Sequence, residues 1–420
     1  MLMAAAAASA TSSLCLCGDH DSISLIGHGG WAMFRRNTRV AGSTPLLAAR
    51  AFLSSVGSTT TLSLHQGVPC HRVQNQNTLT EYELCEFAGT NISLIPGAAA
   101  AAAKADTAVL FLGLSACNNT GGQVCDEGEG RDRHSIGLPA TQLALLQAVV
   151  AVQPRTVLVL INGGALSIQW AKEKVPAIVE AYYPGEAGGE AIAAVLWGRV
   201  SPAGRLPFTV PQESFTARDM LEMDLRAAGG VTGHWMEAAP CFEFGAGGSY
   251  TTWAWAWAGG GGGAAATADA GAVVLQTTEL ANLGGWDLPA LEVRNTGAMD
   301  ADIVSLGFVS RTSNASDAAA AQPSISSRHV IAGAFPIRAL FDFARTTCAA
   351  GASETLRLRL PSDALSVVVE GGERWLVPAE FKLQVGERSG FAPSLGGGAS
   401  IRITLDGPPV RLRSFDWPPM

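Results

Sequence analysis

Hydrophobic residues recur with two different patterns along the chain, and the change of pattern divides it into two regions. Between residues 98 and 215, short apolar runs alternate with stretches whose apolar residues recur every three or four positions. The first pattern predicts buried strands and the second predicts helices, so this region indicates a parallel sheet with helices on both faces. The expected elements are helices at 98–105, 138–152 (with Leu143, Leu146 and Val150 on its buried face), 166–172 and 190–196, and strands at 109–114, 157–161 and 178–182.

The last third of the chain follows a pattern typical of β-structure. Polar and apolar residues alternate in short runs that are separated by turn residues. Several short strands of this kind predict a β-sandwich, which we place at residues 286–405, before a tail at 406–420. Its residues carry no obvious chemistry. The expected strands are at 291–297, 304–309, 353–360 and 381–385.

The stretch between these regions, residues 216–285, has no regular pattern and is expected to be an irregular connection. Trp253, Trp255 and Trp257 alternate, so they lie on one side if the segment is extended. Such a row suits stacking on the apolar face of a sugar ring. A strand edge packed on a neighbouring domain explains the same pattern, and we prefer that interpretation. The glycine run at 259–263 reads as a flexible linker.

Two acidic residues, Glu127 and Glu129, lie in the glycine-rich segment 126–133 that follows the strand expected at 109–114. In open α/β sheets, ligand chemistry gathers at the carboxyl ends of strands. A glutamate on such a loop can act as a general acid if burial or a neighbouring negative charge raises its pKa. On these eight residues alone, a solvated acidic turn is the simpler interpretation.

Two glycine clusters follow the next two strands, at Gly163-Gly164 and within 185–189. A phosphate cradle is a natural first hypothesis for glycines at strand ends. We reject it because there is no GxGxxG at a first strand and no GxxxxGK[ST], and because neither cluster contains a Lys or Arg. Close approach of the backbone to a neutral ligand, or tight packing of a helix on the sheet, explains the glycines better.

Composition and charge narrow the class of protein. The 420 residues are 48% apolar and 15% charged, which indicates a globular protein with two or three domains. The net charge is −8 and no basic block occurs, so a nucleic-acid partner is not expected. No uninterrupted apolar run is long enough to span a bilayer, so no membrane association is expected.

The eight cysteines are scattered and form no paired CxxC groups, so we expect neither a zinc site nor another metal or cofactor. A few disulfides in a secreted protein fit them better, and three sequons, at Asn91, Asn118 and Asn314, add modest weight to secretion. Residues 1–22 are expected to be a leader or disordered. They are rich in Ala and Ser, but no Lys or Arg precedes Arg35, so the positive region of a signal peptide is missing.

Taken in order, several segments resemble the carboxyl-terminal part of family 3 glycoside hydrolases, and most resemble the β-xylosidase/α-arabinofuranosidase branch. Each motif is weak by itself, whereas the ordered set is specific. The matching segments are Ile23–Gly27 (the first strand of the family's α/β sandwich), ADTAVLFLGL at 105–114, EGEGRDR at 127–133 (family EAEGLDR), VLVLINGG at 157–164, YPGEAGG at 183–189, PAGRLP at 202–207, FEFG with SYTT at 242–252, and segments 293–297, 336–345 and 377–386 of a fibronectin-III-like domain. Residues 31–91 match the family poorly.

The resemblance implies an α/β/α sandwich with a mainly parallel sheet at residues 23–215, followed by a fibronectin-III-like β-sandwich. It also implies a retaining glycosidase that hydrolyses O-glycosyl bonds with two carboxylates about 5–5.5 Å apart. Glu129 matches the second glutamate of EAEGLDR and is the candidate acid/base, with Glu127 as the alternative. Asp132 and Arg133 match the DR pair, whose implied role is to hold the loop as a charge pair.

The family's nucleophilic aspartate lies on an amino-terminal barrel, and nothing in this sequence resembles that barrel. Ser316-Asp317-Ala318 is only superficially similar to the nucleophile's neighbourhood. The chain alone is therefore expected to be incomplete or inactive, with a carbohydrate substrate and with the barrel supplied in cis or in trans. Two alternatives stay open: a β-glucosidase-type member of the family, and a non-catalytic remnant that binds a carbohydrate or a protein. The expected location is extracellular or the cell wall.

Overall fold

A computed structural model describes most of the chain as two compact units, one formed by residues 1–200 with 211–217 and the other by 201–210 with 218–420. Residues 48–55, 92–114, 127, 133–185, 187–257, 271–312, 335–368, 372–386 and 398–413 are described with side chains. The backbone alone is described at 13–18, 45–47, 61–65, 70–75, 80–85 and 269–270.

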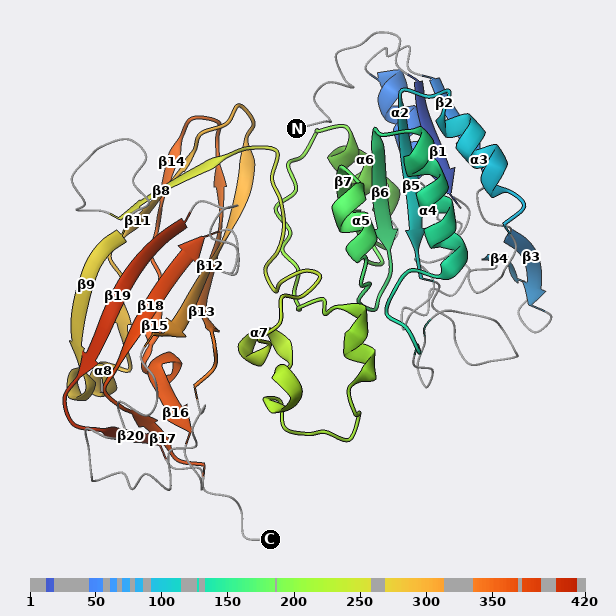
Figure 1. The fold of residues 1–420 in the computed structure, drawn as a ribbon. Coiled ribbons are helices and arrows are strands. Elements are labelled where there is room, and N and C mark those ends of the chain that lie inside the picture. The colour runs from blue at the N-terminus through green and yellow to red at the C-terminus, as the bar shows by residue number, and fades with distance from the viewer. Residues whose placement is uncertain are drawn as a thin grey trace. The chain divides into compact units, whose positions relative to one another are not determined.

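In its described part, the first unit is built on a five-stranded sheet with the order β2-β1-β5-β6-β7 (Figure 1). All four strand pairs are parallel, as the alternation of strands and helices predicts. β5 and β6 are buried along nearly their whole length because layers cover both faces. The strands are β1 (Ser13–Gly18), β2 (Thr61–His65), β5 (Thr107–Gly113), β6 (Thr156–Ile161) and β7 (Ala177–Glu180), and β3 (Cys70–Asn75) with β4 (Thr80–Cys85) forms an antiparallel hairpin.

Helices pack on the sheet in pairs: α3 contacts α4, and α2 contacts α6. The expected buried face of α4 is wrong in part. Leu146 is fully buried, but Leu145 and Val149 are buried with it, whereas Leu143 and Val150 are half buried. Apolar residues occur all round this helix, so their spacing does not single out one face. The helices are α2 (Pro45–Ser55), α3 (Ile95–Ala102), α4 (Ala140–Val152), α5 (Gln169–Lys174) and α6 (Gly188–Leu196).

The sheet begins earlier in the chain than the sequence pattern suggested. β1 lies at Ser13–Gly18, inside the stretch assigned to a leader, and it pairs with β5 and β2. Its sequence, SLCLCG, alternates leucine with cysteine. The strand was not expected because the surrounding residues 1–22 are rich in Ala and Ser, as a leader is. The strand expected at Ile23–Gly27 lies outside the described residues.

The second unit contains the predicted β-sandwich. Two of its sheets have the orders β13-β12-β18-β19-β9 and β14-β11-β8, and all their strand pairs are antiparallel except β19 with β9. The strands are β8 (Trp253–Trp257), β9 (Asp269–Gln276), β10 (Gly285–Asp287), β11 (Leu291–Asn295), β12 (Ala301–Arg311), β13 (Ala339–Cys348), β14 (Ser353–Leu356), β15 (Arg359–Pro361), β16 (Ser366–Val368), β17 (Arg374–Leu376), β18 (Ala379–Gly386), β19 (Gly398–Asp406) and β20 (Val410–Arg413); the short helices are α7 (Thr232–Trp235) and α8 (Thr277–Leu283).

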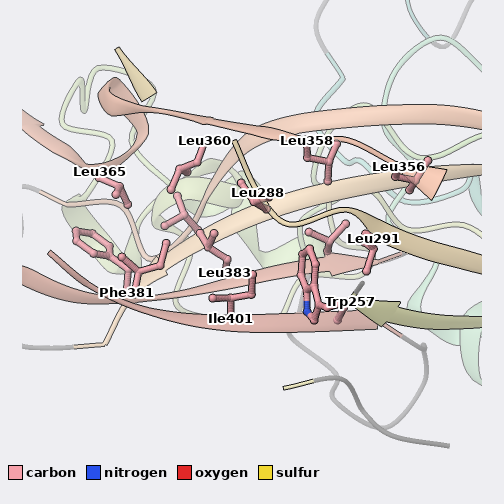
Figure 2. Close-up of a cluster of buried hydrophobic side chains, with 14 of the residues drawn as sticks. Trp257, Leu288, Leu291, Leu356, Leu358, Leu360, Leu365, Phe381, Leu383 and Ile401 are labelled. Atoms are coloured by element: carbon pink, nitrogen blue, oxygen red, sulfur yellow. The ribbon is translucent and has the colours of Figure 1, made fainter. Parts of the chain in front are cut away.

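One continuous apolar core fills the sandwich. Figure 2 shows Trp257, Phe381 and Ile401 among the leucines that form it. Phe381 and Leu383 of β18 alternate with outward-facing residues, as a strand with one buried face requires. The alternation expected over 353–360 is also present, but the chain forms two strands there, because β14 pairs with β11 and β15 pairs with β10.

Two expectations about the ends of this domain are wrong. Residues 216–285 are not only a connection, because β8, β9 and α8 lie within them and both strands pair in the sandwich sheets. The tail likewise contributes β20, which pairs with β17.

Trp255 and Trp257 are each 5% exposed and belong to the core, which explains their alternation and rules out sugar stacking by these two rings. Gly259–Gly263 lies outside the described residues.

Candidate active-site loop

The described part of the candidate loop is held at the carboxyl ends of three neighbouring parallel strands. Leu114 follows β5, Gly163 and Gly164 follow β6, and Tyr183 follows β7. All three strand ends contribute to one cluster around the side chain of Glu127. This is the edge of the sheet at which open α/β folds place their chemistry.

Both oxygen atoms of the Glu127 carboxylate accept hydrogen bonds. Oε1 accepts from the backbone N–H of Gly163 at 2.8 Å and from the hydroxyl of Tyr183. Oε2 accepts from the backbone N–H of Gly164 at 2.9 Å and lies 4.0 Å from Nε of Arg133. The Glu127 and Arg133 side chains are only 15% and 14% exposed, so both are largely removed from water, although Gly163 itself is exposed. Two consecutive backbone N–H groups that face one carboxylate form an anion-binding nest.

The glycines at 163 and 164 are required by this contact. A Cβ at Gly164 would lie 2.6 Å from Oε2 of Glu127 and 2.8 Å from Nη2 of Arg133, and a Cβ at Gly163 would lie 2.7 Å from the Tyr183 ring. The expectation of close backbone approach is therefore right, but the approaching group is a carboxylate of the same chain and not a neutral ligand. The position of Glu127 opposite these glycines depends on the fold and could not be read from local sequence.

Arg133 fixes the carboxyl end of the loop. Its Nη2 donates to the carbonyl of Ala165 at 2.7 Å, while its Nε lies beside Glu127. Three residues further on, the carbonyl of Ile136 accepts from the backbone N–H of Ser167 at 2.7 Å. The contacts of Arg133 reach Ala165 and Glu127, and its expected loop-holding role stays a prediction. Its expected partner Asp132 lies outside the described residues, as does Glu129.

The end of β5, which precedes the loop in the chain, is held by a buried glutamine to which the sequence pattern gave no role. Gln142 of α4 is 1% exposed; its Oε1 accepts from the N–H of Gly113 at 2.9 Å and its Nε2 donates to the Gly113 carbonyl at 2.8 Å. At the next residue, the N–H of Leu114 donates to the Ile161 carbonyl at 3.0 Å, and the Leu114 carbonyl lies 3.3 Å from the Tyr183 hydroxyl, whose proton it shares with Glu127. A polar residue on an apolar helix face was the available signal.

A second carboxyl group lies at the end of β7. Burial raises the pKa of Glu180 from 4.5 to about 7, although hydrogen bonds from the Tyr182 N–H and the Asn162 side chain act in the opposite direction. Asn162 is 1% exposed, and its Nδ2 also donates to the Gly164 carbonyl at 3.0 Å. Asn162 therefore connects Glu180 to the backbone that holds Glu127. In the sequence, Glu180 lies within the strand expected at 178–182 and carries no signal of a role.

Within the described residues, no cluster of three or more His, Cys, Asp or Glu side chains could hold a metal ion. The helices in the same part of the chain are all too short or too polar to cross a membrane. Cys241 and Cys348 are buried free thiols, so the disulfide expectation does not apply to these two. The three sequon asparagines lie outside the described residues.

Comparison with known families assigns both parts of the chain. Residues 11–250 match the Glycosyl hydrolase family 3 C-terminal domain, and residues 327–389 match a Fibronectin type III-like domain. The first match begins before β1, in agreement with the early start of the sheet.

Individual relatives point in the same direction. A β-xylosidase of Formosa agariphila is 28% identical over 307 residues, which cover 73% of this chain and 37% of the relative. Beta-D-xylosidase 1 of Arabidopsis thaliana is 31% identical over 312 residues, which cover 69% of this chain and 37% of the relative. The matches also include β-glucosidases.

Among solved structures, a GH3 exo-β-xylosidase (XlnD) in complex with a xylobiose aziridine probe shares the fold, with a TM-score of 0.70 and 21% identity. The match covers 96% of this chain and 46% of that chain. The chain thus spans less than half the length of each of these three proteins.

Proposed function

This chain belongs to glycoside hydrolase family 3, and from that premise we propose that it is the carboxyl-terminal part of a retaining glycoside hydrolase. In this proposal it supplies the acid/base loop, while the nucleophile comes from the family's amino-terminal barrel, in cis or in trans. The observation that carries the proposal is the nest at the sheet edge, where the backbone at 163–164, Tyr183 and Arg133 fasten the loop through Glu127.

The contacts of Glu127 support Glu129 as the acid/base. A general acid must present a proton to the leaving oxygen and later accept one from water. Three hydrogen bonds from the protein already hold the two oxygens of Glu127, so this carboxylate suits the attachment of the loop better than the exchange of protons with a substrate. Glu127 then acts as an anchor, and Glu129, two residues further along the same loop, reaches the substrate.

The proposed reaction is a double displacement. The nucleophilic carboxylate attacks the anomeric carbon while Glu129 gives its proton to the departing glycosidic oxygen, so that the carbon–oxygen bond breaks and a glycosyl-enzyme forms. Glu129, now ionised, takes a proton from water as that water attacks the anomeric carbon and releases the nucleophile. Residues that fix the loop contribute by holding Glu129 at the distance that these proton transfers require.

The proposed substrates are β-xylosides and α-L-arabinofuranosides of xylan-type polysaccharides, because several relatives are named β-xylosidase or β-xylosidase/α-L-arabinofuranosidase. A β-glucosidase specificity is the alternative, which the β-glucosidases among the matches favour. Secretion, with glycosylation at the sequons, is also proposed, because the proposed substrate is an extracellular polymer.

The test uses an enzyme in which this chain is joined to the amino-terminal domain of a family 3 β-xylosidase. We expect Glu129→Gln to lower kcat on xylobiose by roughly 10²–10⁴-fold, since its leaving group needs a proton. The kcat on an aryl xyloside with an acidic phenol should fall much less, since this leaving group does not need a proton. Added azide should restore turnover of the aryl xyloside, because azide attacks the glycosyl-enzyme without a general base.

Glu127→Gln is the matched comparison, because it should lower turnover of both substrates together and lower the melting temperature. Equal losses on the two substrates for Glu129→Gln would exclude the acid/base assignment. A folded, joined enzyme without turnover on xylosides or glucosides would exclude the hydrolase. Binding of xylobiose by the unmodified chain, measured by calorimetry, would then favour the non-catalytic alternative.

A further inference from the structure

The loop formed by residues 218–231 of the second unit exposes large hydrophobic side chains. Met220 and Leu221 are each 84% exposed, Met223 is 83% exposed and Leu225 is 52% exposed. Among the described residues of this unit, the other exposed large hydrophobic residues occur singly on separate segments, as Val274, Leu283, Ile337, Phe343 and Val368 do. Four such residues within six positions are unusual for a surface in contact with water.

Polar groups give this loop a defined conformation. Arg218 donates from Nη1 to the carbonyl of Ala227 at 2.6 Å and from Nη2 to the carbonyl of Asp224 at 2.8 Å. The N–H of Leu221 donates to Oδ1 of Asp219 at 2.9 Å, and the N–H of Val231 donates to the Leu225 carbonyl at 2.8 Å. The loop is therefore held from inside by its polar residues, while its apolar residues face outward, so it presents a preorganised apolar surface.

The charges of the loop indicate the kind of partner. Arg226 pairs with Asp224, with Nε 3.0 Å from Oδ1, and Arg218 is engaged by carbonyls. With Asp219 and Glu222 included, the loop has three acidic and two basic residues. An anionic membrane or a nucleic acid would find no positive patch here. Methionines adapt to an irregular apolar partner, so the expected partner is the apolar surface of a protein.

We propose that the 218–231 loop is a docking surface for the amino-terminal part that family relatives carry outside the region matched by this chain. The match covers 96% of this chain but 46% of the solved exo-β-xylosidase, and 37% of the Arabidopsis relative, so more than half of each relative is available as the partner. The inference rests on the proposed function, because it identifies the partner that completes the active site. Docking through this loop would cover the exposed methionines.

The experiment measures binding between the full chain and a separately expressed amino-terminal domain of Arabidopsis beta-D-xylosidase 1 by calorimetry. The variant Met220→Ser/Leu221→Ser/Met223→Ser removes three exposed side chains without touching the polar contacts of the loop. We expect its Kd to rise about 10–100-fold. The control Leu283→Ser/Phe343→Ser, which changes two isolated exposed residues, should bind as the unmodified chain does.

Three results would overturn the proposal: equal Kd for the loop variant and the unmodified chain, no binding of either, or a self-associated chain that the loop variant converts to monomers in sedimentation. The last result would assign the surface to a second copy. Failure of the hydrolase proposal looks different, because the two domains would then bind through the loop but their complex would not turn over xylosides.

Discussion

Oε2 of Glu127 and the backbone nitrogen of Gly164 lie 2.9 Å apart, and no Cβ fits at residue 164 beside that contact. The glycine is needed because a carboxylate occupies the space that a side chain would take. Gly163 and Gly164 together offer two N–H groups to one side chain, which attaches the loop to the end of β6.

Gly164→Ala should destabilise the first unit by about 2–3 kcal/mol, because the new Cβ would displace Glu127 and leave buried hydrogen-bonding groups unpaired. Urea unfolding followed by circular dichroism measures this change. Gly97→Ala is the control, since Gly97 lies within α3 with nothing within 4 Å of an added Cβ. That substitution should be neutral or stabilise by about 0.5–1 kcal/mol, because alanine favours helix.

The Glu127 carboxylate should account for most of the cost of Gly164→Ala. In a background that carries Glu127→Ala, the alanine at 164 has no carboxylate to displace, and its additional cost should fall to below about 1 kcal/mol. The double-mutant cycle would then give a coupling free energy of roughly 1–2 kcal/mol. Purely additive effects would show that the glycine is required for another reason, such as the approach of Arg133.

Replacement of Glu127 alone should destabilise the loop attachment. In Glu127→Gln the amide N–H₂ replaces one oxygen and faces the backbone N–H of Gly163 or Gly164, so a donor faces a donor and one N–H loses its partner. The expected cost is about 1–3 kcal/mol in urea unfolding, with faster proteolysis of the chain near the loop. Glu173→Gln, which changes an exposed carboxylate of α5, should cost less than about 0.5 kcal/mol. Equal costs would contradict the anchoring role.

The alternation of strands and helices over residues 107–196 and several sandwich strands could be predicted from sequence because those elements carry their own periodic signal. β5, β6 and β18 lie within two residues of their expected positions. β1, β9 and β20 are among the elements that were missed, for physical reasons: β1 is a short strand in a stretch that resembles a leader, and β9 and β20 form their hydrogen bonds with strands distant in sequence. Their alternation is intelligible only once their partners are known.

The candidate site could likewise be predicted from the sequence only in part. The EGEGRDR motif identified the loop, and the glycine pairs identified a close approach, but the residue that approaches and the role of Gln142 depend on which strand ends are neighbours in space. Likewise, the alternating tryptophans predicted a strand, whereas their burial depends on the sheets that enclose them. Local patterns predict elements and motifs, and tertiary contacts assign roles to individual side chains.

Asn295 should be the polar residue on which the second unit depends most. It is fully buried; its Oδ1 accepts from the Thr251 hydroxyl at 2.5 Å and the Gly297 N–H at 3.1 Å, and its Nδ2 donates to the carbonyls of Met299 and Cys348 at 2.8 and 3.1 Å. Asn295→Ala leaves these buried groups unpaired and should cost about 2–4 kcal/mol.

Thermal unfolding is the measurement for Asn295→Ala, with Thr296→Ala as the neighbouring control. Thr296 is exposed, and its hydroxyl bonds only to the exposed hydroxyl of Thr252 among the described residues. Its replacement should cost less than about 0.5 kcal/mol. A loss at Asn295 no larger than at Thr296 would mean that water or neighbouring groups compensate for the missing amide.

Glu180 should make the stability of the first unit depend on pH. Burial raises the pKa of Glu180 from 4.5 to about 7 in the folded chain. Between these values the folded chain keeps a proton on Glu180 that the unfolded chain has lost, so unfolding releases a proton. The free energy of unfolding should therefore be greatest below pH 4.5 and fall as the pH rises to about 7, by on the order of 2–3 kcal/mol from this group.

Glu180→Gln removes this titration while its side-chain oxygen can still accept from the N–H of Tyr182. At pH 8 the variant should be more stable than the unmodified chain by on the order of 2–3 kcal/mol, and at pH 4.5 the two should be nearly equal. Urea unfolding at pH 4.5, 6 and 8 measures the difference, and Glu190→Gln, an exposed change on α6, should follow the profile of the unmodified chain. If Glu180→Gln changes the free energy of unfolding by the same amount at all three pH values, the carboxyl group does not titrate in this window. The Asn162–Glu180 contact would then act by hydrogen bonding alone.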